Sequence, residues 1–389
     1  MRSLKKESII YVNFAPYENA GGILDYFKDN FKYVALFSFN FHHLGKKGKY
    51  NKLKIYQKGV KIDSKNLIDF QVPEKLIFLF LPFRSLFIFL QITFYTFYLK
   101  YKFGTFENYF TVNAFTAWVG NLLKKAGFVN KTIFWVWDYY PPFHESKIIV
   151  LMRGLYWQFD KWATKSDMLI FLSSRVAKLR KDIGVLSEND RYKIIPVGTT
   201  NIVTEKLRKL RRGSKIKIVF FGVIKKNQGL DLIFNYSNEL KKSFPKLEID
   251  IIGAGPDLKY FKNRGTKSNL KIKYHGYLLE CDIDKIVKRN HIGIAPYIPS
   301  IENEAFYGDP SKIKRYLSFG LPVITTNAFE FSKEIKKTNA GILIKYNKRD
   351  LINAINKVID KYAFYQKGSR KLGKTYYYKN LYPKMFTPY

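Results

Sequence analysis

The residues with the clearest chemical potential lie at 307–327, YGDPSKIKRYLSFGLPVITTN, which indicates a loop, a helix, a tight turn and a strand. Asp309 suits the cap before a helix, and Pro310 suits its first position, where a missing N–H costs nothing. The free N–H groups and positive dipole end of such a helix attract anions, typically phosphate. Ser311 and Lys312 would add a hydroxyl and an ammonium. The stretch predicts an anion site, with a helix that only packs as the alternative.

A glycine loop in the second half offers a complementary set of groups. Residues 215–244 read as strand, loop and helix, and the loop VIKKNQ places Lys225, Lys226 and Asn227 between Gly222 and Gly229. Backbone N–H groups at a strand-to-helix junction can cradle a diphosphate, and lysines can neutralise it. We therefore expect this loop to share one ligand with the helix start.

The first half offers weaker candidates. Asp138 ends an expected strand at 132–142, where a parallel sheet presents side chains to a ligand, and His144 follows six residues later. A loop-capping role for Asp138 is the alternative reading. Gly21 and Gly22 lie in a strand-to-helix loop, where glycine lets the backbone approach a ligand. No set of residues has metal-ligand spacing.

These groups are positioned by two runs of alternating strands and helices. The first covers 1–198, a polar and basic linker follows at 199–214, and the second covers 215–362. The tail, 363–389, is expected to cross back to the first domain. The pattern predicts an α/β fold of two doubly wound, Rossmann-like domains with ligands in a cleft between them.

Composition narrows the setting. Apolar residues make up 47% of the 389, which indicates a globular chain, and a net charge of +37 favours an anionic partner. Part of that charge belongs to a general bias toward Lys, Ile, Asn, Tyr and Phe, and no nucleic-acid-binding signature accompanies it. A single cysteine, Cys281, excludes an internal disulfide and fits a reducing compartment. The N-terminus does not read as a cleavable signal.

The most apolar stretch is 76–99, which is long enough to span a bilayer. Pro82, Arg84, Gln91 and Thr93 interrupt it. Three readings remain open: a helix buried in the core, a helix that dips into a membrane face, and a true span.

The second half resembles GT-B glycosyltransferases of the family 4, or group 1, type. The motifs FFGVIKKNQGLD, IIGAGP, YHGY, IGIAPY, DPSKIKRYLSFGLPVITT and NAGILI follow the order and approximate spacing of that family. The first half, through WVWDYYPPF and KSDMLIFLSS, more loosely resembles members that build polysaccharides at membranes.

The resemblance implies transfer of a sugar from a nucleotide-diphosphate donor, with retention of configuration and without a metal or other cofactor. It places Gly222, Lys225, Lys226, Asn227, Asp309, Ser311 and Lys312 at the diphosphate and His275, Gly276 and Tyr277 near the base. The predicted catalytic residues are Asp138, Lys226 and Lys312, while Gly21, Gly22 and His144 would face the acceptor. A glycan or lipid-phosphate-linked acceptor, an anionic membrane surface and a peripheral position at the inner face of the cytoplasmic membrane complete this expectation.

The chain also departs from the family pattern. Val223 and Gln228 stand where an arginine and a lysine are common, and Tyr307 and Arg315 replace the paired glutamates. We therefore expect Lys225 or Lys226 to supply the loop's missing cation. The alternatives are an inactive scaffold or anionic-polymer-binding protein and, less well supported, a nucleotide-sugar 2-epimerase.

Overall fold

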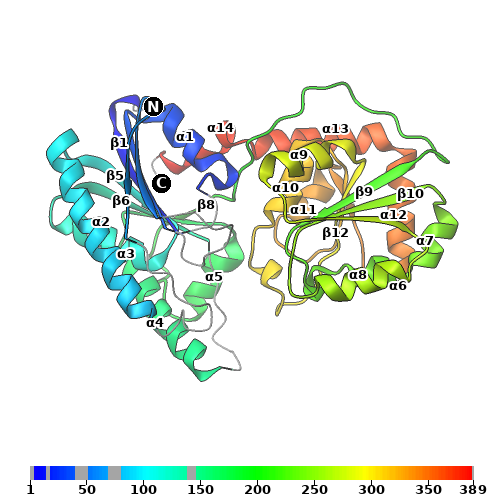
Figure 1. Ribbon diagram of the computed structural model, residues 1–389, viewed down its shortest axis with the longest axis horizontal. Helices are drawn as coiled ribbons and strands as arrows, with labels where there is room; N and C mark the ends of the chain where they lie inside the picture. The colour runs from blue at the N-terminus through cyan, green and yellow to red at the C-terminus, as the bar shows by residue number, and fades with distance from the viewer. Residues whose placement is uncertain (1–3, 15–17, 40–50, 69–79, 138–145, 388–389) are drawn as a thin grey trace. The chain divides into compact units, whose positions relative to one another are not determined.

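The computed structural model describes residues 4–14, 18–39, 51–68, 80–137 and 146–387, and Figure 1 shows two α/β units. The first unit comprises Met1–Pro196 with Tyr382–Tyr389, and the second comprises Val197–Leu381. The residues predicted as a linker, 199–214, belong to the second unit, and so does most of the predicted tail.

The first unit is built on an eight-stranded sheet in the order β4-β3-β2-β1-β5-β6-β7-β8. Strands β1, β2 and β5 to β8 pair in parallel, and β3 and β4 form an antiparallel edge. Every residue of β1 is buried, as expected for a strand covered on both faces. The strands are β1 Ser8–Asn13, β2 Tyr33–Ser38, β3 Lys52–Gln57, β4 Val60–Asn66, β5 Phe106–Thr111, β6 Val129–Val136, β7 Met168–Phe171 and β8 Tyr192–Ile194.

Three helices, α2, α3 and α4, form one layer over the first sheet (Figure 1). Ring contacts join them: Phe89 on α2 lies 6.0 Å from Trp118 on α3, which lies 5.3 Å from Phe159 on α4. On the other side, α1 packs against the end of the chain, where Tyr26 stacks on Phe386. The helices are α1 Ile23–Asn30, α2 Leu81–Phe103, α3 Ala114–Lys125, α4 Lys147–Ala163 and α5 Ser174–Asp182.

The second unit has a six-stranded parallel sheet in the order β11-β10-β9-β12-β13-β14. Its strands are β9 Ile216–Phe221, β10 Leu247–Ile252, β11 Lys271–Gly276, β12 Ile292–Ala295, β13 Val323–Thr325 and β14 Gly341–Leu343. Its helices are α6 Asp231–Asn235, α7 Ser237–Ser243, α8 Leu258–Thr266, α9 Glu280–Arg289, α10 Ser311–Ser318, α11 Ser332–Lys337, α12 Lys348–Asp360, α13 Tyr362–Thr375 and α14 Tyr378–Leu381.

The predicted fold class, α/β with two Rossmann-like halves, is confirmed. In the second sheet the strand order reverses between β9 and β12, because the chain runs outward to β10 and β11 before returning to β12. In open α/β sheets ligands bind outside the carboxyl ends of the strands at such a reversal. The second unit therefore has a defined place to look for its site.

Most of the apolar stretch 76–99 lies in α2, and residues 76–79 lie outside the described part of the chain. Across the described ranges, no helix combines the length and apolarity that crossing a bilayer requires.

Candidate functional site

The ammonium of Lys312 lies at the reversal point of the second sheet. Its Nζ is 4.2 Å from the ring centroid of Phe220 on β9 and 4.9 Å from that of Tyr297, two residues after β12. It donates a 2.6 Å hydrogen bond to Oε1 of Gln228 in the glycine loop. The helix start and the glycine loop, predicted separately, thus meet at one side chain.

Lys312 is buried without a charged partner. The residue is 7% exposed, and no ion pair joins it to any carboxylate in the described ranges. Burial lowers the pKa of this ammonium to about 7. A cation held in an apolar site without a counter-ion is unfavourable, and an anionic ligand would relieve that cost. This burial without a counter-ion favours the predicted anion site, which stays a prediction.

Close backbone packing shapes the loop around this ammonium. Gly222 has φ +135°, and a Cβ placed there would lie 2.9 Å from Nζ of Lys312. Gly253, in the turn after β10, also has φ +135°, and its Cβ would lie 1.9 Å from the carbonyl oxygen of Gly222. A Cβ on Gly229 would lie 1.7 Å from the carbonyl oxygen of Pro296. Backbone fills the space beside Gly229 and Gly253, and at Gly222 the positive φ and the Lys312 side chain disfavour any larger residue.

The start of α10 differs from the prediction in one respect. The helix begins at Ser311, Pro310 occupies the cap position, and no side chain caps the first turn. The predicted cap role of Asp309 is therefore wrong. Its buried carboxylate instead forms an ion pair with Lys314 and accepts a 2.6 Å hydrogen bond from the Val197 N–H. Through these contacts Asp309 links the loop before α10 to Lys314 and to the Val197 backbone. The first N–H groups of α10 therefore have no side-chain acceptor.

Lys314, which the sequence reading did not select, completes this support. Its ammonium donates to the carbonyl of Val197 over 2.9 Å and lies 4.7 Å from the ring centroid of Tyr376. Burial raises the pKa of the Asp309 carboxyl, and the neighbouring Lys314 opposes that shift. Two buried lysines on one helix thus have different surroundings: Lys314 is paired and Lys312 is not.

Lys225, Lys226 and Asn227, the other predicted residues of the glycine loop, contact groups other than Lys312. Lys226 lies with its ammonium 4.6 Å from the ring centroid of Tyr260, and Nζ of Lys225 is 3.9 Å from a carboxylate oxygen of Glu304. The Asn227 carbonyl accepts from Nδ2 of Asn303 over 2.9 Å, while its buried Oδ1 has no hydrogen-bond partner in the described ranges. The ammonium that lies beside Gly222 is therefore that of Lys312. The expectation that Lys225 or Lys226 supplies the cation missing from the loop stays a prediction.

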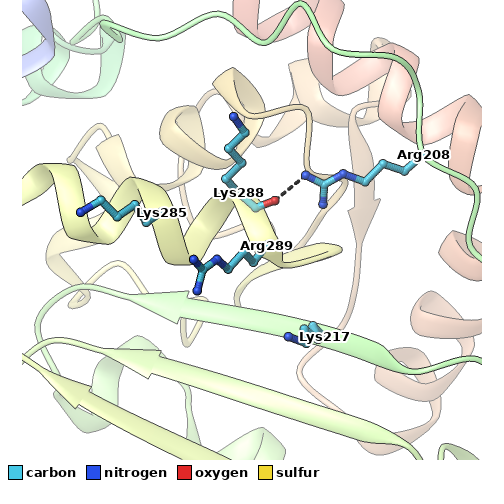
Figure 2. A pocket seen from close by; sticks show the side chains of 5 residues that line it. All are labelled: Arg208, Lys217, Lys285, Lys288 and Arg289. Atoms are coloured by element: carbon cyan, nitrogen blue, oxygen red, sulfur yellow. Dashed lines mark hydrogen bonds between the residues drawn. The ribbon is translucent and has the colours of Figure 1, made fainter.

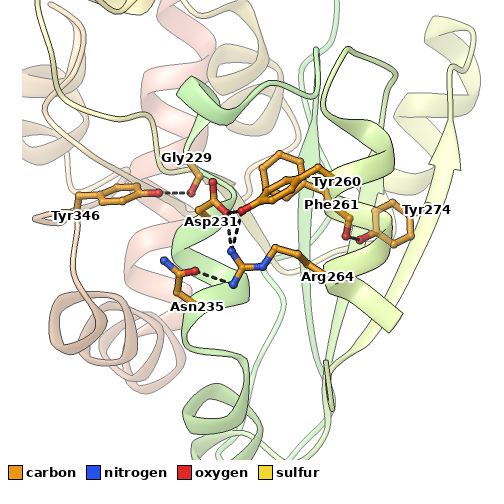
Figure 3. Close-up of polar contacts among 8 residues, drawn as sticks. All are labelled: Gly229, Asp231, Asn235, Tyr260, Phe261, Arg264, Tyr274 and Tyr346. Atoms are coloured by element: carbon orange, nitrogen blue, oxygen red, sulfur yellow. Dashed lines mark hydrogen bonds and ion pairs between the residues drawn. The ribbon is translucent and has the colours of Figure 1, made fainter. Parts of the chain in front are cut away.

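Figure 3 shows the polar cluster that fixes the far end of the loop. Oδ1 of Asp231, the first residue of α6, accepts hydrogen bonds from the Tyr260 hydroxyl over 2.9 Å and from Arg264 over 2.8 Å. Arg264 also donates to Asn235 over 2.7 Å. The hydroxyl of Tyr346 donates to the Gly229 carbonyl over 3.1 Å. The short helix after the loop is thereby tied to α8, which holds the loop in place.

The residues predicted near the base lie at the end of β11. Nε2 of His275 is 2.7 Å from Oδ1 of Asp250, so one ring nitrogen already has a partner within the protein. The Gly276 carbonyl accepts from the Gly253 N–H over 2.8 Å, which places it beside the packed glycine turns. Tyr277 is 56% exposed, and its ring is available to a ligand.

The predicted acceptor residues belong to the first unit. Gly21 and Gly22 have φ of 63° and 83° and lead into α1, as expected for a glycine turn. The Gly21 carbonyl accepts a 2.9 Å hydrogen bond from the hydroxyl of Tyr382 near the end of the chain. Asp138 and His144 lie outside the described residues. Within the described ranges, no group of His, Cys, Asp and Glu side chains could hold a metal ion.

A separate cavity of about 570 Å³ lies near the start of β9, at the end of the strand away from Lys312. Five cationic residues line it (Figure 2). Arg208 donates to the carbonyls of Lys288 and Asn290, so its guanidinium caps the end of α9. Burial, aided by the charges of Arg208 and Lys217, lowers the pKa of the nearby His291 to about 4. The cavity is lined by Arg208, Lys217, Lys285, Lys288 and Arg289. Lys217 is the second residue of β9, whose other end leads to Gly222, so this cavity is separate from the site at Lys312.

Comparisons with known proteins bear on the fold and the family. Residues 203–375 match the family described as Glycosyl transferases group 1. No curated protein sequence matches the chain. Among solved structures, the sucrose-phosphate synthase of Thermosynechococcus elongatus superposes with a TM-score of 0.68 at 13% identity, over 98% of this chain and 97% of that chain.

Two further structures cover the chain almost completely. Anabaena HepE in complex with UDP-glucose has a TM-score of 0.61 at 14% identity, over 98% of both chains. The lipopolysaccharide outer core galactosyltransferase WaaB, in its apo form, has a TM-score of 0.60 at 16% identity, over 97% of this chain and 98% of that chain. At these identities the likeness shows the fold.

The whole chain has the fold of GT-B glycosyltransferases, and the family match lies in its second unit. More particularly, its second unit carries the glycosyltransferase group 1 domain, over residues 203–375. The resemblance stated from the motifs of residues 215–345 is confirmed.

Proposed function

We propose that this glycosyltransferase moves a sugar from a nucleoside-diphosphate donor to a glycan or lipid-linked acceptor, at the inner face of the cytoplasmic membrane. One observation carries the donor half of the proposal: the buried, unpaired ammonium of Lys312 lies at the reversal point of the second sheet, against the glycine loop.

The chemistry follows from these groups. When the bond between sugar and diphosphate breaks, negative charge develops on the departing phosphate oxygens. The Lys312 ammonium and the free N–H groups at the start of α10 would stabilise that charge, and Ser311 would add a hydroxyl donor. Because the Lys312 ammonium, the helix N–H groups and the loop lysines can share the diphosphate charge, we propose a reaction that needs no bound metal. Lys226 would assist from the loop, once a ligand draws it away from Tyr260.

We further propose a reaction that retains the anomeric configuration, as the group 1 resemblance implies. Asp138, His144, Gly21 and Gly22 are the acceptor-side candidates. Anabaena HepE has been solved in complex with UDP and with UDP-glucose, so these are the first compounds to test on this chain.

The testing experiment measures the melting temperature of the purified protein against a panel of nucleoside diphosphates and nucleotide sugars. A ligand that binds only the native state raises this temperature. We expect a rise for one base. We expect no rise in Lys312→Met, because the variant lacks the cation that holds the diphosphate. Lys217→Met, at the opposite end of β9, is the matched control and should keep the rise.

The stability of Lys312→Met without ligand shows whether Lys312 serves ligand binding or holds the fold together. Replacing an unpaired buried charge with an apolar side chain of similar length should leave stability unchanged or raise it. Absence of any rise in the wild type would contradict the donor site and favour the inactive-scaffold alternative. Sugar transfer that stops in EDTA and returns with a divalent cation would contradict the metal-independent reaction.

A further inference from the structure

Helix α2 has an inverted pattern of burial. Its polar residues Arg84, Gln91 and Thr96 are buried. Oε1 of Gln91 accepts a 2.5 Å hydrogen bond from the Ile68 N–H, which gives the inward amide a partner. The outward residues are large and apolar, with 64% exposure for Phe83 and 64% for Phe94. Their spacing of three or four residues places them on one helix face; they are Phe83, Leu86, Leu90, Phe94, Phe97 and Tyr101.

A second apolar face lies on α4, in the same helical layer. Ile148 is 60% exposed and Leu151 is 62% exposed, and Leu155 continues their row one turn later. The ring contacts of Trp118 on α3 with Phe89 and Phe159 hold α2 and α4 on either side of α3. Figure 1 shows the three helices over the same face of the sheet. The nine apolar side chains named on α2 and α4 are called the apolar face below.

Charge indicates what covers this face. Asp160 is the sole acidic residue in the sequences of α2, α3 and α4, and it is buried in an ion pair with Arg180. Each of these helices ends within five residues of the next strand, at Phe106, Val129 or Met168. Because β5, β6 and β7 are parallel neighbours, the three helix ends lie along one edge of the layer. The exposed lysines at that edge are Lys102, Lys125, Lys161 and Lys165.

Asp167 at this edge is paired with Lys124, so the lysines dominate the charge there. An apolar surface edged by lysines suits the boundary between the acyl chains and headgroups of an anionic bilayer. Phenylalanine and tyrosine rings at the surface also suit that boundary. A second copy of the chain would bring the same lysines near one another across an apolar contact, so repulsion disfavours that occupant.

We infer that the apolar face of α2 and α4 docks on anionic lipid, with its apolar side chains in the outer acyl region and the four edge lysines among the headgroups. This inference deepens the proposed function, because it names the surface that would hold the enzyme beside a lipid-linked acceptor. It rests on the proposed membrane position but not on the donor site.

The test is vesicle flotation of the full chain, with vesicles of phosphatidylglycerol and phosphatidylcholine in a 1:3 ratio and with pure phosphatidylcholine. We expect the wild type to float with the anionic vesicles. The variant Leu86→Gln/Leu90→Gln/Phe94→Gln should bind at least about tenfold more weakly, because it loses three exposed apolar side chains. Leu279→Gln/Phe364→Gln removes exposed apolar residues from the second unit and should bind like the wild type.

A second set of variants in the same flotation assay tests the contribution of the four edge lysines. Lys102→Gln/Lys161→Gln should weaken binding by about fivefold per lysine, since each contributes attraction to anionic lipid. Lys336→Gln/Lys337→Gln, on α11 of the second unit, is the matched control and should have no such effect.

Three results would overturn the inference: a wild type that does not float, a triple variant that floats as well as the wild type, or sedimentation showing a wild-type dimer that the triple variant dissociates. Thermal shift with the nucleotide panel on the same proteins separates this from the donor proposal. Lost flotation with a retained ligand response supports the docking face. A missing ligand response in every protein would count against the donor site alone.

Discussion

At the scale of single residues, Lys312 makes the protein sensitive to pH in a defined window. The pKa of a lysine in the unfolded chain is 10.5, and that of Lys312 in the folded protein is about 7. The unfolded state therefore holds the extra proton between these values. The contribution of this group to the free energy of unfolding should rise with pH in that window, by up to about 1.4 kcal/mol per unit. Lys312→Met should lack this component.

The same proton governs donor binding. An anionic diphosphate favours the ammonium form, so affinity for a nucleotide sugar should be highest below pH 7 and fall by up to about tenfold per unit above it. Isothermal titration with UDP-glucose between pH 6 and 9 measures this dependence, because its diphosphate keeps a constant charge there. Proton uptake on binding at pH 8, seen by changing the buffer, is the second readout. A flat affinity across this range would show that Lys312 does not contact the donor.

Lys314 should respond to substitution in the opposite way from Lys312. Lys314→Met leaves the buried Asp309 carboxylate without its cation and removes the hydrogen bond to the Val197 carbonyl. Breaking a buried ion pair from one side costs about 3–5 kcal/mol. Urea unfolding should thus show a large loss for Lys314→Met and none for Lys312→Met. Equal losses in both variants would mean that Lys312 also has a structural counter-charge.

At the scale of elements, the sequence predicted what local rules determine. The β-branched run after Pro322 forms β13, and Gly320 ends the preceding helix with φ +68°, as its position required. The glycine loop and the start of α10 were both recognised from short motifs. Their meeting at Lys312 follows from strand order, since β9 and β12 lie side by side although their sequences are more than 70 residues apart.

Long-range contacts were beyond such rules. The carboxylate of Asp309 binds Val197, which lies 112 positions away, and no local pattern announces that partner. In α2, the few polar residues of an otherwise apolar sequence did not by themselves show which face points inward. The structure places Arg84 and Gln91 inward because buried polar groups find partners there, such as the backbone of Ile68 for Gln91. Polar residues in an apolar helix thus marked its buried side.

At the scale of the whole molecule, the cationic side chains behind the net charge of +37 are of two kinds, exposed and buried. Most are exposed lysines and arginines, whose attraction for anions is screened within about 10 Å at 0.1 M salt. Lys312 is 7% exposed and is screened far less. Raising the salt concentration should therefore weaken the binding of anions to surface cations much more than the binding of an anion at Lys312.

Raising sodium chloride from 0.05 M to 0.5 M should weaken the binding of anionic vesicles by more than about tenfold, because the lysine edge of the first unit is exposed. Binding of a mixed-sequence oligonucleotide should fall at least as steeply and show no sequence preference. The affinity for the nucleotide donor should change by less than about threefold, because α10 and the glycine loop enclose its cation. Donor binding that fell in parallel with oligonucleotide binding would attribute all three to surface charge, and the anionic-polymer-binding alternative would then be the better account of the chain.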